Sequence, residues 1–156
     1  MTRIALAETA DDLDNVRRLF DEYWHSFGFT PCFQGFDKEL ANLPGKYAPT
    51  EGRLGLAFVG EAPAGCVALR RIDAERCEMK RLYVRSEFRG RGAGQALLEW
   101  VTNEARRAGY QEMVCDTMPV MKQALEMYER AGFRRTAPYV GDATPGAIYL
   151  RLGLRD

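Results

Sequence analysis

The stretch CEMKRLYVRSEFRGRGAGQALLEWVTNEARRA, residues 77–108, decides the fold that this chain can adopt. It begins as an apolar strand over Cys77–Val84, continues as a basic glycine-rich turn and ends as a helix over Gly92–Ala108. Because glycine lacks a Cβ, a bulky anion can approach several backbone N–H groups of such a turn. The helix start adds unpaired N–H groups and a partial positive charge, which Arg89 and Arg91 reinforce. The turn is therefore predicted to hold a phosphate or a pyrophosphate.

Two other kinds of glycine-rich turn have residue patterns that differ from this one. A P-loop needs Lys followed by Ser or Thr after its last glycine, whereas Gln95 and Ala96 follow Gly94 here. A dinucleotide-binding turn has the spacing G-x-G-x-x-G and an acidic residue about 20 positions further on. The spacing in this chain is G-x-G-x-G, and Asp116 comes late, at a strand end. Both are disfavoured, and a tight turn whose glycines serve only the backbone geometry remains as the plain alternative.

The remaining pattern is Arg/Gln-x-x-Gly-x-Gly/Ala, and residues 89–94, RGRGAG, match it in full. On these residues the chain resembles the GNAT superfamily of acyl-CoA-dependent N-acyltransferases. In that family this loop grips the pyrophosphate of coenzyme A. The resemblance therefore implies acetyl-CoA as the acyl donor, held by six consecutive residues: Arg89, Gly90, Arg91, Gly92, Ala93 and Gly94.

The order of the expected elements agrees with this family. Strands are predicted over Arg3–Ala7, Leu54–Val59, Gly65–Ile72, Cys77–Val84, Glu112–Thr117, Phe133–Thr136 and Ala147–Leu154. Helices are predicted from the cap Thr9 to Gly28, over Phe36–Asn42, over Gly92–Ala108 and from Pro119 to Gly132. The order is β-α-α-β-β-β-α-β-α-β-β. The resemblance implies an α/β (α+β) fold with a mixed, mostly antiparallel sheet of six to seven strands, helices on both faces and splayed central strands. Residues 1–156 are expected to form a single N-acetyltransferase domain.

The bulk composition limits the classes of binding partner, the metal sites and the compartment that we expect. Lys plus Arg and Asp plus Glu are both 22, so no broad surface for nucleic acid or membrane is expected. The four cysteines are far apart and the chain has one histidine, so no metal site is expected. Cys66, Cys77 and Cys115 fall in strand-like runs and are interpreted as reduced core residues. The N-terminus lacks an apolar signal core, and the cytoplasm is the expected compartment.

The strand before the glycine-rich turn is expected to carry the acyl chemistry through its backbone. In the resembled family the pantetheine arm pairs with this strand, which by position means the N–H and C=O groups of Leu82, Tyr83 and Val84. The family's strand also carries a bulge that frees one N–H to polarise the thioester carbonyl, and Leu82 is the candidate donor. The side chains of Leu82 and Val84 are expected in the core in any case.

The candidate acid is Tyr128, in LEMYERAGF at residues 125–133. This run is similar to the family's L-Y-E-x-x-G-F region, whose tyrosine reprotonates the departing thiolate, although Met127 replaces the leucine. The alternative is a packing aromatic on the buried face of a helix. We favour the acid, because Phe would pack there without burying a hydroxyl group. A further departure from the family is Met121, where many relatives carry an Asn, so the role of that Asn is not transferred.

Several groups compete as the base that deprotonates the amine. Glu78 lies eleven residues before Arg89, which is the spacing of the base in histone-type members, but it could equally be a solvated strand residue paired with Lys80 or Arg76. Asp116 is the competing carboxylate, and many members deprotonate the amine through water. His25 is interpreted as a packing or surface residue.

The expected function is an acetyl-CoA-dependent N-acetyltransferase that acts by direct attack in a ternary complex, since no cysteine is placed for an acyl-enzyme. In the family the acceptor binds between the first helices and the last hairpin, a region that contains Tyr23, Trp24, His25, Phe29, Tyr47, Tyr139 and Asp142. The acceptor is a small-molecule amine, an amino-acid-like amine or a peptide amine. The rivals are a non-catalytic CoA-binding or sensing module and a nucleotide-binding regulator. Homodimerisation, through an edge strand or the C-terminal segment, is a further expectation.

Overall fold

The structure, a computed structural model, describes residues 2–26, 36–139 and 146–155. Within these residues seven strands form one sheet, in the order β1-β2-β3-β4-β5-β7-β6. The strands are β1 (Thr2–Leu6), β2 (Arg53–Val59), β3 (Ala62–Arg71), β4 (Arg76–Val84), β5 (Glu112–Thr117), β6 (Arg134–Thr136) and β7 (Ile148–Gly153). The helices are α1 (Ala10–Ser26), α2 (Phe36–Ala41), α3 (Ala93–Arg107) and α4 (Lys122–Arg130), with short 3-10 turns at η2 (Gly45–Tyr47) and η3 (Ser86–Phe88).

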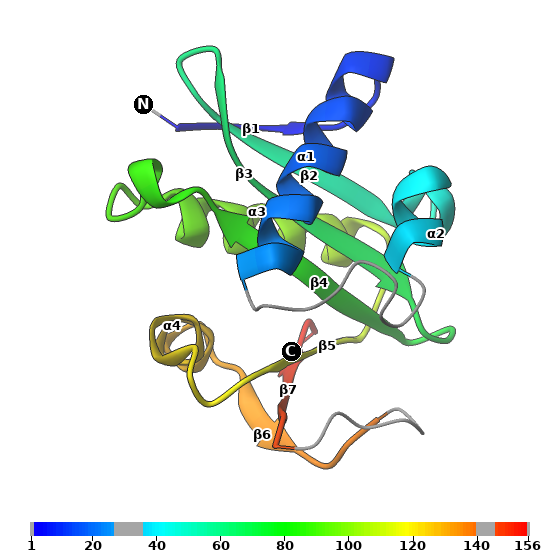
Figure 1. The fold of residues 1–156 in the computed structure, drawn as a ribbon. Coiled ribbons are helices and arrows are strands. Elements are labelled where there is room, and N and C mark those ends of the chain that lie inside the picture. Colours follow the sequence, from blue (N-terminus) through cyan, green and yellow to red (C-terminus); the bar gives the residue numbers. More distant parts are fainter. Residues whose placement is uncertain (1, 27–35, 140–145, 156) are drawn as a thin grey trace.

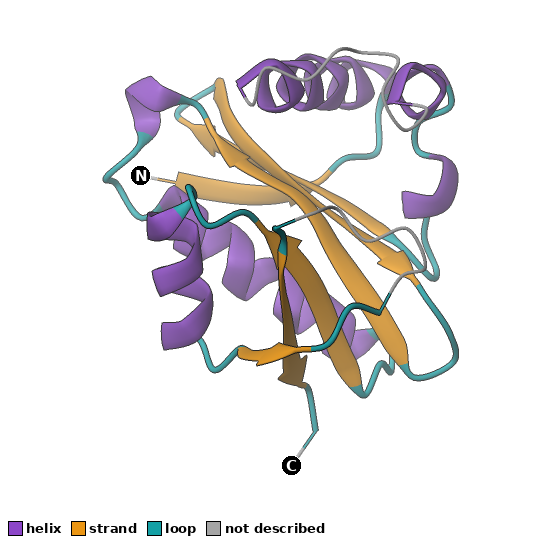
Figure 2. Ribbon diagram, turned by 60° about the horizontal axis from the view of Figure 1, so that its bottom comes forward, coloured by secondary structure: helices purple, strands orange, loops and turns teal. Residues whose placement is uncertain are grey.

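Helices cover both faces of the sheet, as Figure 1 and Figure 2 show: α1 and α2 lie on one face, α3 and α4 on the other. All strand pairs are antiparallel except β4 with β5, which is parallel. The crossover helix α3 makes that parallel pair possible, because it carries the chain back along the sheet before β5 begins. The predicted fold class, a mostly antiparallel sheet between two helical layers, is confirmed.

The first helix begins where the capping pattern predicts. The Thr9 side-chain oxygen accepts a hydrogen bond from the Asp12 N–H at 3.1 Å, and the Asp12 carboxylate accepts one from the Thr9 N–H at 3.2 Å. The Glu8 N–H also donates to Asp12, at 3.0 Å. These bonds, led by the one from Glu8, lower the pKa of Asp12, and they satisfy N–H groups that a helix start leaves unpaired.

Two hydrophobic clusters form the core, one on each face of the sheet. The α3-side core includes Val67, Leu69, Cys77, Met79, Leu97, Val101, Met113, Cys115, Tyr128, Phe133 and Leu150. The α1-side core includes Val16, Leu19, Phe20, Trp24, Phe36, Tyr47, Leu54, Leu56, Cys66 and Ala68. Cys66, Cys77 and Cys115 are buried and free, which agrees with the predicted core role, and Cys32 lies outside the described residues.

The central pair of strands separates partway along its length. The strands β4 and β5 pair only where Arg76–Glu78 of β4 lies beside Glu112–Val114 of β5. Beyond these residues the two strands run apart (Figure 1). On its other side β4 stays paired with β3 to its end, but the register shifts between Lys80↔Ala68 and Tyr83↔Cys66. Arg81 and Leu82 therefore face the single residue Val67, which defines a β-bulge. The bulge and the separation occur in the same part of β4.

Two element starts, those of α4 and β3, differ from the sequence prediction by three residues. The helix α4 begins at Lys122 and not at Pro119: residues 119 and 120 form a turn, and the Val120 side chain is 80% exposed. The hairpin between β2 and β3 is tighter than predicted, because the Val59↔Ala62 pair leaves only Gly60 and Glu61 in the turn. Pro63 lies in the strand beside a register shift, a position that tolerates proline.

None of the helices in the described residues has both the length and the apolar composition that a membrane span requires.

Close packing of α3 on β2 yields a test of the fold. A Cβ on Gly55 would lie 2.5 Å from Cζ3 of Trp100, so Gly55→Ala must displace the indole ring. We expect a loss of about 1–3 kcal/mol in the free energy of unfolding, measured by urea denaturation. The control is Gly153→Ala, because nothing lies within 4 Å of a Cβ at that position. Equal stabilities of the two variants would contradict the packing described here.

Candidate functional site

The glycine-rich turn joins β4 to α3 through η3, next to the separation of β4 and β5. Gly90 and Gly92 have φ angles of 79° and 81°, the left-handed region that favours glycine. Gly92 caps α3 without a side-chain hydrogen bond, and the first bond into the helix runs from the Ala96 N–H to the Gly92 carbonyl oxygen at 3.0 Å. The N–H groups of residues 93–95 therefore have no partner within the helix. Together they form the kind of anion-binding helix start that the sequence predicts.

Gly94 differs from the two other glycines of the turn. It lies in the first turn of α3, its φ is not in the left-handed region, and a Cβ there would make only ordinary contacts, with Sδ of Met127 at 3.7 Å and Cγ2 of Val84 at 3.8 Å. The backbone conformation and the packing would both accept alanine, which is also the better helix former. The fold gives no reason for glycine here, whereas a ligand that approaches the backbone closely would.

The basic residues around the turn have different partners. Nε of Arg89 donates to the Val84 carbonyl oxygen at 2.9 Å, which fastens the turn to the end of β4. Arg85 forms a bidentate pair with Glu22 of α1, with its closest N–O distance at 2.7 Å. The hydrogen bonds that Arg85 donates to the Glu22 carboxylate raise the pKa of Arg85. Arg91 is exposed and makes no hydrogen bond or ion pair with the described residues. Of these three arginines, Arg91 has the guanidinium group most available to an anion.

The end of β4 presents its backbone and not its side chains. Leu82 and Val84 pack against the α3-side core, and Tyr83 packs against the α1-side core. Beyond Glu78 the described residues provide no strand partner for β4 on its β5 side. An unpartnered strand edge offers N–H and C=O groups to an extended ligand. The structure thus leaves the predicted place for a pantetheine arm open, along residues 82–84.

Tyr128 lies in α4 with 5% of its surface exposed, and its ring packs against Phe133 at a centroid distance of 5.7 Å. Burial, together with nearby Cys115 and Asp116 of β5, raises the pKa of its hydroxyl well above that of a free tyrosine. The hydroxyl has no hydrogen-bond partner among the described residues. It is therefore a protonated hydroxyl, free to donate, beside the separated part of β5.

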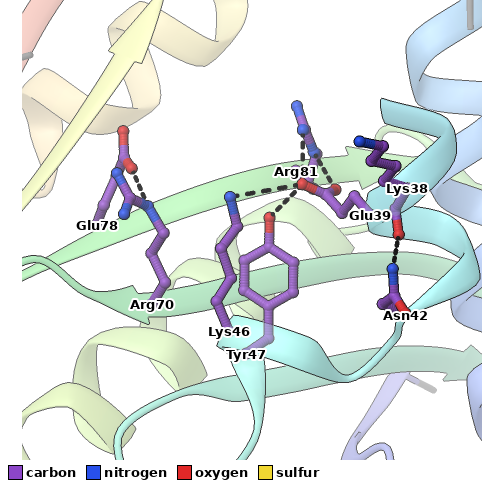
Figure 3. Close-up of polar contacts among 8 residues, drawn as sticks. All are labelled: Lys38, Glu39, Asn42, Lys46, Tyr47, Arg70, Glu78 and Arg81. Carbon is purple, nitrogen blue, oxygen red and sulfur yellow. Dashed lines mark hydrogen bonds and ion pairs between the residues drawn. The ribbon is translucent and has the colours of Figure 1, made fainter. Parts of the chain in front are cut away.

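Glu78 is buried and both of its carboxylate oxygens are engaged. One accepts a hydrogen bond from Nε of Arg70 at 2.6 Å, and the other accepts one from the Tyr139 hydroxyl, also at 2.6 Å (Figure 3 shows the pair with Arg70). The alternative of a solvated residue paired with Lys80 or Arg76 is wrong, since Glu78 is 3% exposed and Arg76 pairs with Asp73. The sequence analysis missed Arg70, although the β3–β4 register places it directly opposite Glu78.

Asp116, the competing carboxylate, lies on β5 beyond the last residue that pairs with β4. Its side chain is exposed, yet desolvation by the surrounding protein and the nearby Glu78 charge raise its pKa above that of an ordinary aspartate. His25 is exposed at the end of α1, with its Nδ1 2.8 Å from the Asp21 carbonyl oxygen, which agrees with the predicted surface role. The structure therefore brings together Tyr128, Glu78 and Asp116, and leaves His25 apart.

The aromatic residues expected around the acceptor are partly used by the core. Trp24 stacks on Phe36 at 4.4 Å, and the buried Tyr47 donates its hydroxyl to Glu39 at 3.0 Å. Phe29 and Asp142, from the same expected set, lie outside the described residues. In place of the family's Asn, Met121 caps α4, and its sulfur accepts a hydrogen bond from the Thr117 hydroxyl at 3.5 Å. The described residues contain no group of three or more His, Cys, Asp or Glu able to hold a metal ion.

Comparison with known proteins identifies relatives over the whole site. The model of the acetyltransferase (GNAT) family matches residues 13–133. An uncharacterized N-acetyltransferase of Schizosaccharomyces pombe is 38% identical over 151 residues, which covers 96% of this chain and 93% of that protein. An uncharacterized N-acetyltransferase of Dictyostelium discoideum is 28% identical, and the match covers 97% of this chain and 99% of that protein.

Solved structures agree on the fold. The crystal structure of a GNAT-family acetyltransferase from Staphylococcus aureus superposes with a TM-score of 0.83 at 16% identity, over 99% of this chain and 100% of that one. The yncA protein of Salmonella typhimurium, solved with its cofactor acetyl-CoA, superposes with a TM-score of 0.76 at 19% identity, over 100% of this chain and 95% of that one. At these identities the two structures establish the fold alone.

Gly94→Ala tests whether the turn receives a ligand. Because the fold accepts a Cβ at this position, we expect the free energy of unfolding to stay equal or to rise by about 0.5–1 kcal/mol. If a diphosphate lies against the backbone, the same Cβ should weaken acetyl-CoA binding, measured by isothermal titration, by about tenfold, or roughly 1.4 kcal/mol. A variant that is as stable as the parent and binds acetyl-CoA equally well would contradict a ligand at Gly94.

Proposed function

Because the chain belongs to the GNAT family of acetyltransferases, we propose that it moves an acetyl group from acetyl-CoA to a primary amine by direct attack within a ternary complex. The observation that carries this proposal is the separation of β4 from β5 immediately before the glycine-rich turn. A thioester needs such an opening, with a hydrogen-bond donor and a proton donor at its walls. In this proposal the space between β4 and β5 is the opening, the Leu82 N–H is the hydrogen-bond donor and the Tyr128 hydroxyl is the proton donor.

The cofactor is held by backbone groups in this proposal. The diphosphate lies on the N–H groups of residues 90–94, and Arg91 adds the charge that Arg85 does not supply. The pantetheine arm pairs with the free edge of β4 along Leu82, Tyr83 and Val84. The Leu82 N–H, at the second position of the bulge, polarises the thioester carbonyl and stabilises the oxyanion that forms on attack.

Tyr128 completes the transfer as the proton donor. The amine nitrogen attacks the carbonyl carbon, the C–S bond of the tetrahedral intermediate breaks, and the thiolate takes the proton of the Tyr128 hydroxyl. The raised pKa of that hydroxyl keeps it protonated at neutral pH, so the acid is present when the thiolate departs. Burial raises the pKa of the Cys77 thiol to about 12 and that of the Cys115 thiol further, which argues against a cysteine acyl-enzyme.

The amine gives its proton to one of two carboxylates, Glu78 or Asp116, directly or through water. Glu78 is held between Arg70 and Tyr139, and its charge helps to raise the pKa of Asp116. A carboxylate with a raised pKa is a stronger base than an ordinary aspartate. The exposed side chain of Asp116 also leaves room for a water or for the amine itself.

The acceptor is a small-molecule or peptide amine, and the cytoplasm is the proposed compartment, which the three free buried cysteines support. A homodimer stays an expectation of the sequence. A panel of amines, assayed for release of free thiol from acetyl-CoA, tests the enzyme against its rivals. A CoA-binding or sensing module would bind CoA and release no thiol with any amine. A nucleotide-binding regulator would bind ATP or NAD at least as tightly as CoA.

Tyr128→Phe separates the proton donor from a packing residue. We expect kcat to fall by about 10²–10⁴-fold, because the thiolate must then leave without its acid, while the Kd for acetyl-CoA changes by less than about threefold. The matched control is Tyr110→Phe, which removes another buried hydroxyl, one that donates to the Glu51 carbonyl oxygen at 2.7 Å. This control should lose about 1 kcal/mol of stability and keep its kcat. Parallel losses of kcat and acetyl-CoA affinity in Tyr128→Phe would refute the role of proton donor.

A further inference from the structure

The bulge of β4 rests on an unusual backbone. Arg81 has a φ of 60°, and among the described residues it is the one non-glycine residue with a positive φ. A side chain with a Cβ is disfavoured in this left-handed region, where glycine is accommodated without a steric penalty. Arg81 is the first of the two residues that face Val67, and Leu82 is the second. The conformation of Arg81 therefore sets the direction of the peptide N–H of Leu82.

The side chain of Arg81 is held on the α1 and α2 face of the sheet. Its Nε and Nη2 donate to the two carboxylate oxygens of Glu39, both at 3.1 Å, and both side chains are nearly buried, with exposures of 13% and 12% (Figure 3). Its guanidinium group also lies over the rings of Trp24 and Phe36, at 5.3 and 5.4 Å from their centroids. One charged group of the bulge is thus fixed by α1 and α2 at once.

Glu39 is itself held in place from a third element. Its carboxylate accepts a hydrogen bond from the Tyr47 hydroxyl at 3.0 Å, and Nζ of Lys46 lies 3.7 Å away, both from η2 (Figure 3). Burial disfavours the charge of Glu39, but the hydrogen bonds and the charge of Arg81 outweigh it, so the pKa of Glu39 lies below its ordinary value. Both members of the pair are charged, and each is held in place by more than one contact.

Stability alone is a weak explanation for this arrangement. Two charges taken out of water contribute little net stability, and a glycine at position 81 would avoid the steric penalty of the left-handed backbone. Strained residues that the surroundings hold in place are concentrated at functional sites, where they position a reacting group. The group next to Arg81 is the Leu82 amide, in the part of β4 that lies beyond its pairing with β5.

We propose that Glu39 and Arg81 form a positioning pair, which locks the bulge of β4 so that the Leu82 N–H points at the thioester carbonyl. This inference rests on the proposed function. Neither side chain touches the cofactor: Arg81 acts through its own backbone, and Glu39 acts through Arg81. Loss of the pair should therefore slow the chemical step while the diphosphate contacts, on the far side of Val84, remain.

The test compares two ion pairs of similar burial. Glu39→Gln and Arg81→Gly both remove the charged contact, and the second also relieves the backbone. The control is Glu104→Gln, which breaks the Arg53–Glu104 pair between β2 and α3, with an N–O distance of 3.0 Å and exposures of 13% and 14%. We expect kcat to fall about 10–100-fold in Glu39→Gln and Arg81→Gly, with the Kd for acetyl-CoA within about threefold of the parent. Glu104→Gln should keep the parent kcat.

A thermal unfolding midpoint accompanies each measurement. If Glu39→Gln and Glu104→Gln lower the midpoint alike and leave kcat alike, the pair is structural and the proposal is overturned. If Glu39→Gln does not fold, Arg81→Gly is measured in its place. A parent-like kcat in Arg81→Gly overturns the proposal as well. Rescue of part of the kcat by Arg81→Lys, which keeps the charge, would support it.

The positioning pair can still be tested if the parent chain releases no thiol with any amine, a result that would defeat the proposed function by itself. In that case the amide resonance of Leu82 is compared by NMR between the parent, Glu39→Gln and Glu104→Gln. A shift of the Leu82 amide in Glu39→Gln alone supports the lock on the bulge. An unchanged Leu82 amide in Glu39→Gln shows that the pair does not set its direction.

Discussion

The pairing of β4 with β5 ends after Glu78 and Val114, and the rest of the site depends on this break. If β4 and β5 stayed paired along their full length, their backbone N–H and C=O groups would bond to each other and leave no strand edge for a ligand. Because β4 bulges at Arg81 and Leu82, it turns away from β5 while its other edge stays paired with β3. The glycine-rich turn follows the freed end of β4 after η3, and Tyr128 lies beside the same opening in α4.

The opening is held from both faces of the sheet by different forces. On the α3 side, Leu82 and Val84 pack into the core, so burial of apolar surface fixes the strand. On the α1 side, the bidentate contact of Arg81 with Glu39 fixes the bulge, and Glu78 is neutralised by Arg70 where the strands separate. A buried carboxylate that lost its partner would carry a large desolvation cost, so these pairs also keep the strands from shifting register.

Local signals in the sequence predict most of the fold. The Thr9 cap, the strand–turn–helix of residues 77–108 and the order of the elements could be predicted, because each depends on residues close together in the chain. The start of α4 could not, since Pro119 is compatible with both a first helical residue and a turn, and packing decides between them. The partners of Glu78 and Arg81 depend on contacts across the sheet, with Glu39 lying 42 residues from Arg81. Likewise, no local pattern marks a non-glycine residue for the left-handed region.

The most direct measurement is a crystal structure of this chain with acetyl-CoA bound. The account predicts β4 and β5 apart beyond Glu78, the thioester oxygen within hydrogen-bonding distance of the Leu82 N–H, and the diphosphate on the N–H groups of residues 90–94. It predicts the sulfur beside the Tyr128 hydroxyl as well. A complex with the acyl group outside this opening, or with β4 and β5 paired along their full length, would contradict it.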